Sequence, residues 1–597
     1  MADSPNTDSD GVVSFTIEAN GSAISDEIQV LSIEVLKTIN RIGGAILVFQ
    51  DGDMPTKDFP LSNEDDFKPG SEVVIKAGYE GVTEQIFSGI VVRHGISIGG
   101  SNKTRLVIEC KDKAVGMTIA RNCNNYVKQK DSDIMTTLIG NCSGLSATVD
   151  TTNTQFEELV QYNCSDWDYM LSRAEANGLV VCNDDAAVTV KAPDTSSSAV
   201  LTVTYGEDLM TFNADIDARY QYSSVKGVSW DISTQATIEE EVATQTLNSQ
   251  GDLTSSDLAS TLGLSEYRMQ TGTYYEKTAL KDWATAQQIK SGLARIRGDM
   301  RFQGSAKAKI GTIIEVAGVG NRFNGDVYVS SVKHEIEGGQ WITEIEFGMS
   351  PAWSADYRDL TAPPASGLMP GVEGLQIGVV KKLDEDPDKQ NRIQVTVPVM
   401  QNDTEGVWAR LATYYASSGF GNFFIPEIGD EVVLGYFNNN PGDPVILGSL
   451  YSSGRAPPYE LTAENNTKAI VTKSKLTIEF DEDKKVITVI TPGNNKIVLS
   501  DDGKSILLQD QNDNKVELGT GGITLDSPKD IKINASGKIS IDAVGEISIS
   551  SSGGDISGSA LNINLDAQVG FVGKGAATAE VSASGTTTIK GAMVMIN

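Results

Sequence analysis

An eight-residue repeat in the last quarter of the chain limits strongly what this chain can fold into. Apolar residues recur in two series, two residues apart, with glycines at positions 537, 545 and 553 between them. The repeated apolar residues are Ile523, Leu525, Ile531, Ile533, Ile539, Ile541, Ile547 and Ile549. Two apolar residues two apart, followed by a turn, predict short strands that each present one narrow apolar face.

Such strands cannot enclose a core within one chain, because nothing lies opposite the apolar face. Residues 465–597 contain no Trp, Tyr, Cys, His or Arg, so almost no aromatic side chains are available to fill the gap. Three copies around a threefold axis can cover one another's apolar faces, and each buried aliphatic side chain then contributes about 1.5–3 kcal/mol. We therefore predict that residues 465–597 form a β-helix or β-prism in a homotrimer. The eight repeated residues form its core.

The first 365 residues show mainly the alternating pattern of half-buried strands. Apolar and polar residues alternate over Val12–Glu18, Glu72–Ala77, Gln85–Arg93 and Arg105–Cys110, with Gly-rich or Asn-rich turns between them. Antiparallel strands in barrels are the expected result. We treat residues 1–365 as one composite hub.

Three helices interrupt these strands. One is predicted between Ser165, a suitable N-cap, and Asn177-Gly178, which supplies a left-handed stop. A short helix is expected over residues 131–139. Another is expected where Ala286, Ile289, Leu293 and Ile296 share one face. The apolar faces of these helices contain no titratable residue in this interpretation, so packing is their predicted role.

A second domain is predicted over residues 370–457, between the stiff joints 363–367 and 452–458. Its expected strands are Gly374–Leu383, Arg392–Met400, Val407–Thr413, Glu431–Phe437 and Pro444–Leu450. Five strands in about 80 residues suit a small closed barrel of the OB type. The predicted fold class is thus mainly β: a hub of barrel modules with a few helices, an OB-fold barrel and a trimeric β-prism.

The charge balance excludes some classes of partner. The 597 residues include 80 acidic and 48 basic ones, which gives a net charge of −32. Residues 465–597 hold 16 acidic and 13 basic residues, so almost all of the surplus lies before them. Such a field repels phosphate backbones and anionic membrane surfaces, and an OB-fold that binds nucleic acid is therefore disfavoured.

Cysteine usage and hydropathy indicate the compartment. The five cysteines are odd in number and show no C-x-x-C spacing, which favours unpaired thiols in a reducing compartment over disulfides or a zinc site. Residues 1–11 lack a signal-peptide pattern, and no apolar run reaches the ~20 residues of a membrane span. We expect assembly in the cytoplasm, without a signal peptide.

Motifs that suggest chemistry are weak. Gly95-Ile96-Ser97-Ile98-Gly99 has the spelling of a nucleophile elbow, but a turn and a strand follow it where a helix is required. His94 and His334, the two histidines, lie in strand-like stretches and are expected to be structural. Residues 384–388 begin like a calcium loop, yet Lys389 replaces its glycine, and a hairpin tip is favoured. We predict a non-enzyme with no cofactor and no metal.

Four stretches within this organisation resemble a known family. The barrel segment Phe424-Ile425-Pro426-Glu427-Ile428-Gly429-Asp430-Glu431-Val432-Val433, followed by Pro441-Gly442-Asp443-Pro444, is similar to the base domain of VgrG-type spike proteins. Phe67-Lys68-Pro69-Gly70 and residues 163–178 resemble the hub of that family. Its members belong to type VI secretion systems, contractile phage tails and phage-like extracellular injection systems.

The resemblance implies a mechanical role with specific partners. The trimeric hub would match a hexameric inner tube and contact baseplate proteins, and the prism would carry the thrust of a contracting sheath to a target membrane. The chain's last residues resemble a tip onto which a PAAR-type protein docks: Met593, Val594, Met595, Ile596 and Asn597. Effector cargo would travel with the tip or the tube, and the spike would be ejected from the cell.

One alternative from another class stays open at this stage. Trimeric β-prisms also occur in receptor-binding or polysaccharide-degrading tail fibres. A polysaccharide-degrading prism needs a cluster of carboxylate, aromatic and basic residues, and the missing Trp, Tyr, Arg and His after residue 465 oppose that alternative. Whether the machine is anchored in a cell or released as a particle is left open by the residues.

Overall fold

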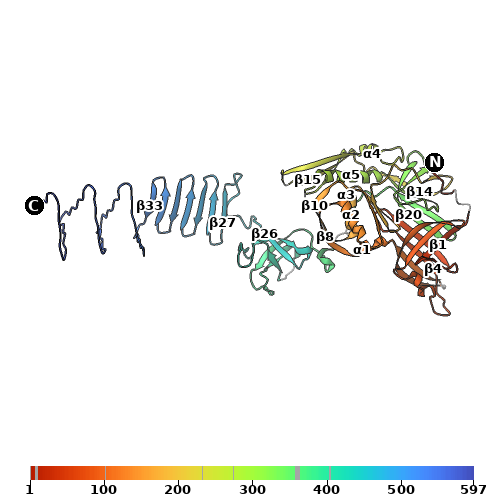
Figure 1. The fold of residues 1–597 in the computed structure, drawn as a ribbon, viewed down its shortest axis with the longest axis horizontal. Coiled ribbons are helices and arrows are strands. Elements are labelled where there is room, and N and C mark those ends of the chain that lie inside the picture. Colours follow the sequence, from red (N-terminus) through yellow and green to blue (C-terminus); the bar gives the residue numbers. More distant parts are fainter. Residues whose placement is uncertain are drawn as a thin grey trace. The chain divides into compact units, whose positions relative to one another are not determined.

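The computed structural model describes residues 2–6, 11–100, 103–231, 233–245, 247–272, 274–356, 363–401 and 405–596. The chain divides into two compact units, Met1–Leu450 and Tyr451–Asn597. β-Strands dominate the secondary structure of the described residues, and five of the strands close into a barrel (Figure 1). The predicted fold class is confirmed in this respect.

A thirteen-stranded sheet organises the part of the chain before the barrel; we call the described residues up to Asp356 the hub. Its strands are β1 (Val13–Ala19), β2 (Ser22–Ala23), β3 (Val30–Thr38), β4 (Gly44–Gln50), β5 (Glu72–Tyr79), β6 (Val82–Gly99), β7 (Lys103–Lys111), β13 (Leu201–Thr204), β14 (Leu209–Ile216), β18 (Ile296–Gln303), β19 (Ile313–Ala317), β20 (Gly325–Glu337) and β21 (Gln340–Phe347). Its main path runs β14-β18-β21-β20-β3-β4-β7-β6-β5-β1-β2. Segments from the two ends of the hub therefore share one sheet.

The large sheet supports two cores. One is built from strands β1 to β7 and includes the buried Phe49, Phe67 and Phe87. The other lies mainly on β13 and β18–β21 and includes Phe302 and Tyr328. β20 pairs with β3 in antiparallel register, so it joins the strands of the two cores. Alternation of buried and exposed side chains along these strands follows the sequence pattern.

Smaller sheets and helices complete the hub. The sheets are β8 (Arg121–Lys130) with β10 (Gln155–Ser165); β9 (Ser146–Val149), β12 (Ala187–Lys191) and β11 (Val180–Asp184); and β16 (Ala236–Ala243), β15 (Ser224–Asp231) and β17 (Glu266–Gln270). The α-helices are α1 (Gly116–Ile119), α2 (Asp131–Gly140), α3 (Asp166–Ala176), α4 (Ser255–Thr261) and α5 (Lys277–Leu293). None of the helices among the described residues is long and apolar enough to cross a membrane.

The predicted helix ends are partly confirmed. Ser165 caps α3 by accepting a hydrogen bond from the backbone N–H of Asp168, and Gly178 follows the helix with a φ of 72°. The prediction was wrong for Ile296, which begins β18. α5 stops at Leu293, where Ala294 and Arg295 turn the chain into the sheet. Ile296 is buried there by tertiary packing, so its helical spacing is coincidental.

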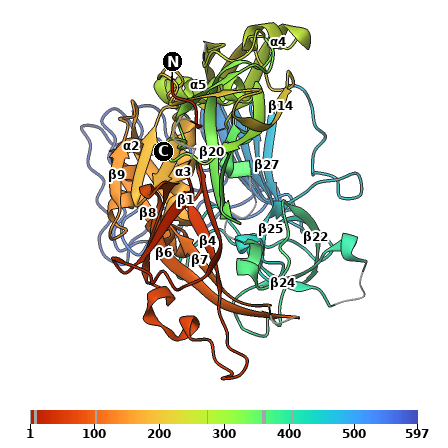
Figure 2. The ribbon, with the colours of Figure 1, turned by 90° about the vertical axis from the view of Figure 1, so that its right-hand side faces the viewer.

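The closed barrel contains β22 (Gln376–Lys382), β23 (Ile393–Thr396), β24 (Val407–Leu411), β25 (Glu431–Tyr436) and β26 (Pro444–Ser449) (Figure 2). All five expected strands are present within a few residues of their predicted bounds. Inward apolar residues such as Val395, Val432 and Leu434 are fully buried.

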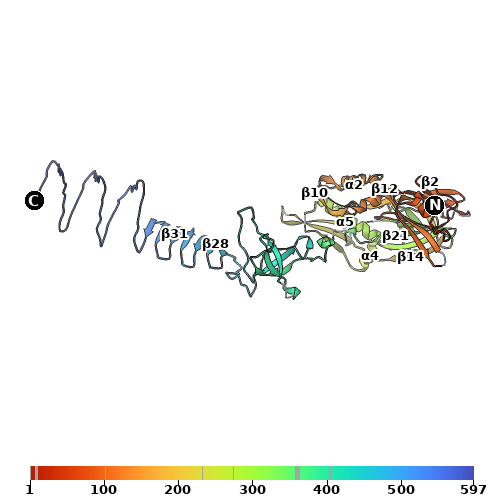
Figure 3. The same cartoon turned by 90° about the horizontal axis from the view of Figure 1, so that it is seen from below.

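The second unit starts as one antiparallel sheet of seven strands. They are β27 (Thr467–Val471), β28 (Thr477–Asp481), β29 (Val486–Ile490), β30 (Lys496–Ser500), β31 (Ser505–Gln509), β32 (Lys515–Gly519) and β33 (Gly522–Asp526). Each strand pairs with the next, and the strands form a single row (Figure 3). After β33 the described chain continues as an open zigzag without further strands (Figure 1).

Candidate assembly surface and identification

Over six of the seven strands of this sheet, β28–β33, one face is an uninterrupted apolar surface, which we call the apolar face. Every position of β28–β33 on this face is Ile, Leu, Val or Phe. The residues are Ile478, Phe480, Ile487, Val489, Ile497, Leu499, Ile506, Leu508, Val516, Leu518, Ile523 and Leu525. Strand register stacks them in two columns, since Ile497 lies opposite Val489 on one side and Leu508 on the other. Two columns of apolar side chains are a surface suited to burial.

The apolar face is open to solvent in the single chain. Ile497 and Leu499 in the middle of the sheet are 42% and 41% exposed, although each is flanked by apolar neighbours on both adjacent strands. The opposite face contains polar residues on each of the strands β28–β33; on β30 it presents Lys496, Val498 and Ser500. A soluble protein rarely leaves so long an apolar surface uncovered. The sheet therefore has the form of one wall of a larger core.

The hairpin turns explain how this register is maintained. Thr472, Thr491 and Asp510 recur at equal intervals, and each accepts a hydrogen bond through its side chain from the backbone N–H of the fourth residue after it, at 2.9–3.2 Å. These bonds help to hold the pKa of the Asp510 carboxyl at about 2, with the Asn514 side chain as the largest cause. The repeat before the octads is therefore a unit of two strands, as in the interval from Thr472 to Thr491. The alternation of apolar residues predicts the single strands, but not that they repeat in pairs.

The eight predicted core residues fall into two structural groups. Ile523 and Leu525 belong to β33 and continue the two columns of the apolar face. The six later residues, Ile531, Ile533, Ile539, Ile541, Ile547 and Ile549, lie in the zigzag and are 49–72% exposed. An extended chain that finds no pairing partner in its own molecule must obtain its backbone hydrogen bonds elsewhere. Their role in a trimer core stays a prediction.

The predicted tip residues are also exposed. Met593, Val594, Met595 and Ile596 have exposed fractions of 78%, 50%, 83% and 87%, while Asn597 lies outside the described residues. Four consecutive exposed apolar side chains are compatible with a docking site. Their partner stays a prediction.

A buried ion pair in the hub was missed by sequence reasoning. Lys290 Nζ on α5 lies 2.7 Å from Glu175 Oε1 on α3, with the two side chains 8% and 4% exposed. The same ammonium donates to the carbonyl of Ala352 at 2.9 Å and lies 5.1 Å from the Trp353 ring centre. The Ser354 N–H donates to Glu175 Oε2 at 2.7 Å. The pair therefore holds residues 352–354, near the end of the hub, against α3 and α5.

A signal for this pair was present in the sequence. Glu175 follows the buried Leu171 by four residues, and Lys290 follows the buried Ala286 by four. This spacing places both charges on buried helix faces. The expectation that these helix faces carry no titratable group was wrong.

The two histidines have structural partners. His94 Nε2 is 2.8 Å from Ser62 Oγ, and its Nδ1 is 2.9 Å from the carbonyl oxygen of Phe67. His334 is 4% exposed in the interior of β20, with Nδ1 at 3.0 Å from Thr343 Oγ1. Burial, aided by the charge of Lys37, lowers the pKa of His334 to about 3.

His334 should make the hub sensitive to mild acid. Between pH 6.5 and pH 3 the unfolded chain binds a proton that the native imidazole does not, so the free energy of unfolding falls by about 1.4 kcal/mol per pH unit as pH drops. We expect urea midpoints of the wild type to fall between pH 7 and pH 5 more steeply than those of His334→Gln. The two profiles should run parallel above pH 7. Equal slopes below pH 6.5 would contradict the assignment.

The remaining chemical motifs have structural explanations. Gly95–Gly99 lies within β6, which pairs with β7 rather than leading into a helix, so the hairpin interpretation is confirmed. All five cysteines are free thiols, as predicted. Burial raises the pKa of Cys110 to about 12 and that of Cys182 to about 11, which makes both poor nucleophiles. No cluster of metal-binding side chains occurs among the residues that the structure describes.

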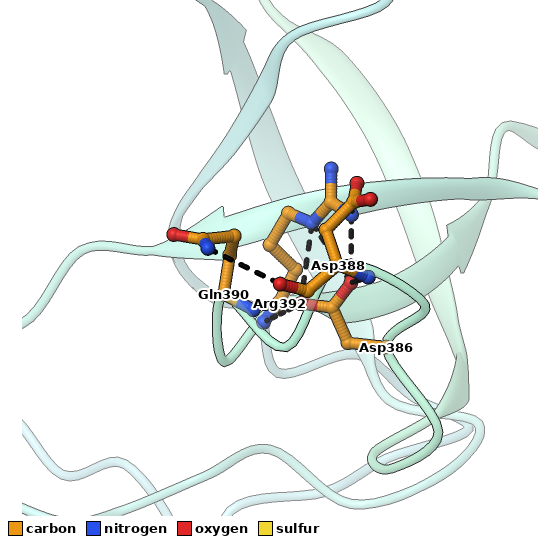
Figure 4. Close-up of polar contacts among 4 residues, drawn as sticks. All are labelled: Asp386, Asp388, Gln390 and Arg392. Carbon is orange, nitrogen blue, oxygen red and sulfur yellow. Dashed lines mark hydrogen bonds and ion pairs between the residues drawn. The ribbon is translucent and has the colours of Figure 1, made fainter.

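The calcium-like loop is an ion-paired hairpin tip between β22 and β23 (Figure 4). Arg392 donates to Asp386 Oδ1 through Nη2 at 2.6 Å and through Nε at 3.1 Å. Asp386 Oδ2 accepts the backbone N–H of Gln390 at 2.7 Å, and Arg392 also reaches Asp388. The Arg392 side chain holds the pKa of the Asp386 carboxyl well below its usual range. Because these donors occupy Asp386, the loop is stabilised without a cation.

Two protein families match the chain. The type VI secretion system/phage-baseplate injector OB domain matches residues 376–451, the segment that closes into the five-stranded barrel. The Alg8 N-terminal domain matches residues 9–338, more than half of the chain. Among curated proteins, the spike protein VgrG5 of Pseudomonas aeruginosa is 30% identical over 125 residues, and VgrG1c of the same species is 29% identical over 136. The chain belongs to the Alg8 N-terminal domain family, and part of it is similar to VgrG-type spike proteins.

The matches of the chain to these curated relatives are partial. They cover 20% of the chain and 15% of VgrG5, and 21% of the chain and 18% of VgrG1c. The chain thus spans less than a fifth of the length of these relatives.

Solved structures of low sequence identity also align with it. The 43 kDa tail protein of prophage MuSo2 from Shewanella oneidensis is 13% identical, with a TM-score of 0.43 over 57% of this chain and 98% of that protein. A type VI secretion component from E. coli is 12% identical, with a TM-score of 0.36 over 73% of this chain and 99% of that protein.

Proposed function

We propose that this chain is a VgrG-type protein, the homotrimeric hub and spike of a contractile injection machine. In this role the hub joins a hexameric inner tube and the baseplate, and the second unit forms a spike that pierces a target membrane. A PAAR-type tip protein and effectors are its cargo. We place its assembly in the cytoplasm and its destination outside the producing cell, and we assign it no catalytic step.

The observation that carries this proposal is the apolar face of β28–β33. Two further copies can cover it if three sheets form the walls of a triangular prism. Each strand contributes only two apolar residues to the face, a width of about 7 Å. Three walls this narrow can enclose a compact aliphatic core. The octad residues would extend that core, with backbone hydrogen bonds between chains replacing those that the zigzag lacks.

Light scattering of the purified full chain tests the oligomer. We expect the mass of three chains at micromolar concentration, unchanged in mild denaturant, because the buried aliphatic surface is large. A dimer would contradict the threefold arrangement, since two sheets would then cover each other face to face. A monomer would refute the proposed function.

Deletion of residues 593–597 tests the tip. The truncated protein should stay trimeric, because the deleted residues lie after the last octad, and should lose binding of a PAAR-type partner by at least about tenfold. Pull-down or calorimetry with that partner measures the effect. Ser582→Ala/Ser584→Ala, placed just before the tip, serves as the matched control and should bind normally. Unaltered binding by the truncated protein would contradict the tip assignment.

A further inference from the structure

β8 is a long edge strand with basic side chains. It pairs with β10 along one side, from Arg121 opposite Ser165 to Lys130 opposite Gln155, and no other described strand pairs with it. Its ten residues include Arg121, Lys128 and Lys130 and no acidic residue. A strand of ten residues presents an edge of roughly 33 Å. This edge offers backbone donors and acceptors to an incoming strand.

β16 is an edge strand of the opposite charge. It pairs in full register with β15, from Ala243 opposite Ser224 to Ala236 opposite Asp231, and its other edge is unpaired among the described strands. The strand carries Glu239, Glu240 and Glu241 in succession and no basic residue. Both strands thus expose an edge of similar length, one basic and one acidic.

The carboxylates of β16 are incompletely neutralised by their own sheet. Lys226 Nζ on β15 lies 2.7 Å from Glu266, but 3.8 Å from Glu239 and 3.9 Å from Glu241. One ammonium group therefore serves three carboxylates. Glu239 and Glu241 side chains are 45% and 52% exposed. The acidic edge keeps a surplus of negative charge that a basic strand can neutralise.

Open strand edges usually carry protection against pairing, such as charges of one sign, bulges or a covering loop. Here the charges protect each edge against its own kind, since two β8 strands or two β16 strands would place like charges opposite each other. They favour the pairing of a β8 edge with a β16 edge. Within one chain these two strands belong to different sheets and do not pair.

We propose that β8 of one copy adds to the edge of β16 of the next copy and joins their sheets across the hub interface. Such a contact uses two different surfaces, so it is head-to-tail and can close into a ring of three. Backbone hydrogen bonds supply affinity, and the charges select the partner edge. This inference rests on the proposed homotrimer and adds a second interface, in the hub, to the one proposed for the spike.

The exposed Cys123 on β8 allows a direct test in the full chain. Single cysteines are introduced on β16 at Thr237, Glu239, Glu241 and Ala243, which are its exposed positions after Ala236. Mild oxidation should link neighbouring copies as covalent dimers and trimers on denaturing gels. Because a disulfide requires Cβ atoms within roughly 4.5 Å, only one or two of the four positions should react efficiently and thereby reveal the register. Replacing Cys123 by Ala is the control and should abolish the linkage.

A mixing experiment separates contacts between copies from contacts within one. One variant has Cys123 and an unmodified β16; the other has Cys123→Ala together with the reactive β16 cysteine. Only linkage between copies can join the two in co-assembled trimers. The variant that carries both Cys123 and the β16 cysteine could instead link them within one chain and migrate as a fast monomer. That result, with no linked product from the mixture, would overturn the proposal.

Charge reversal provides a second readout. Lys128→Glu/Lys130→Glu should slow cross-linking several-fold at low salt, and so should Glu239→Lys/Glu241→Lys with the cysteine at another position. Combining both reversals should restore the rate, because the signs are again opposite. A trimer by light scattering without cross-linking at any position would refute this interface and leave the proposed function standing. A monomer would refute the proposed function itself.

Discussion

The Ile533→Asp/Ile541→Asp variant is expected to lose the trimeric spike while its hub stays folded. In the proposed prism each chain contributes both side chains to one core, so the variant places six carboxylates in an aliphatic interior. Burying unpaired charges costs several kcal/mol for each group. That cost outweighs the roughly 1.5–3 kcal/mol which each replaced side chain contributed.

Light scattering and protease resistance measure this effect. We expect a lower mass at micromolar concentration and rapid cleavage after residue 526, while near-UV circular dichroism of the hub changes little. Lys532→Asp/Ser540→Asp is the matched control, because these residues lie one position from the repeated isoleucines and face the other way along an extended strand. A control that fails equally would show that charge anywhere in the octads is harmful. A trimeric, protease-resistant Ile533→Asp/Ile541→Asp protein would place the core elsewhere.

Lys290→Met is expected to lower the free energy of unfolding of the hub by about 3–5 kcal/mol. The substitution leaves the Glu175 carboxylate buried without its cation. It also removes the hydrogen bond to the Ala352 carbonyl and the contact with the Trp353 ring. Faster hydrogen exchange in residues 349–356 should accompany the loss, since this segment is held by the pair.

Two variants make that prediction specific. Glu175→Leu/Lys290→Met removes both charges and should recover much of the loss, because an apolar pair of similar size carries no desolvation cost. Lys68→Met breaks the exposed pair with Asp65, whose side chains are 61% and 87% exposed, and should change stability little. Urea unfolding followed by tryptophan fluorescence and hydrogen exchange gives the comparison. A Lys290→Met protein as stable as Lys68→Met would mean that the pair contributes nothing to the hub.

Local sequence patterns predicted the secondary structure well where interactions between residues close in sequence determine it. The cap at Ser165, the stop at Gly178 and the five barrel strands depend on interactions within a few residues or on strict alternation. The two-strand hairpin repeat of β28–β32 is not visible in the alternation of apolar residues, because only its turns distinguish the two strands: Thr or Asp side chains cap one set of turns, while Asp481 and Ser500 close the other. The prediction that the helix includes Ile296 was wrong, because a buried strand residue can by chance lie at a helical spacing from the residues before it.

Long-range contacts account for what sequence patterns could not supply. The joining of β3 to β20 unites segments from opposite ends of the hub, and no local signal specifies that register. The opposite charges of β8 and β16 are visible in the sequence, but their meaning depends on both strands being edges of different sheets. Similarly, Glu175 and Lys290 acquire significance only when α3 and α5 meet.

The sequence by itself determined that the last quarter of this chain has one narrow apolar face, because a period of two places every second side chain on one side of a strand. It also determined the barrel, whose alternation and length suit closure. Only the tertiary structure decided which residues line that face in β28–β33, which strands of the hub remain as open edges, and which charges are buried together. Those outcomes depend on burial and hydrogen bonding between distant segments, and burial is a property of the whole fold rather than of any one stretch.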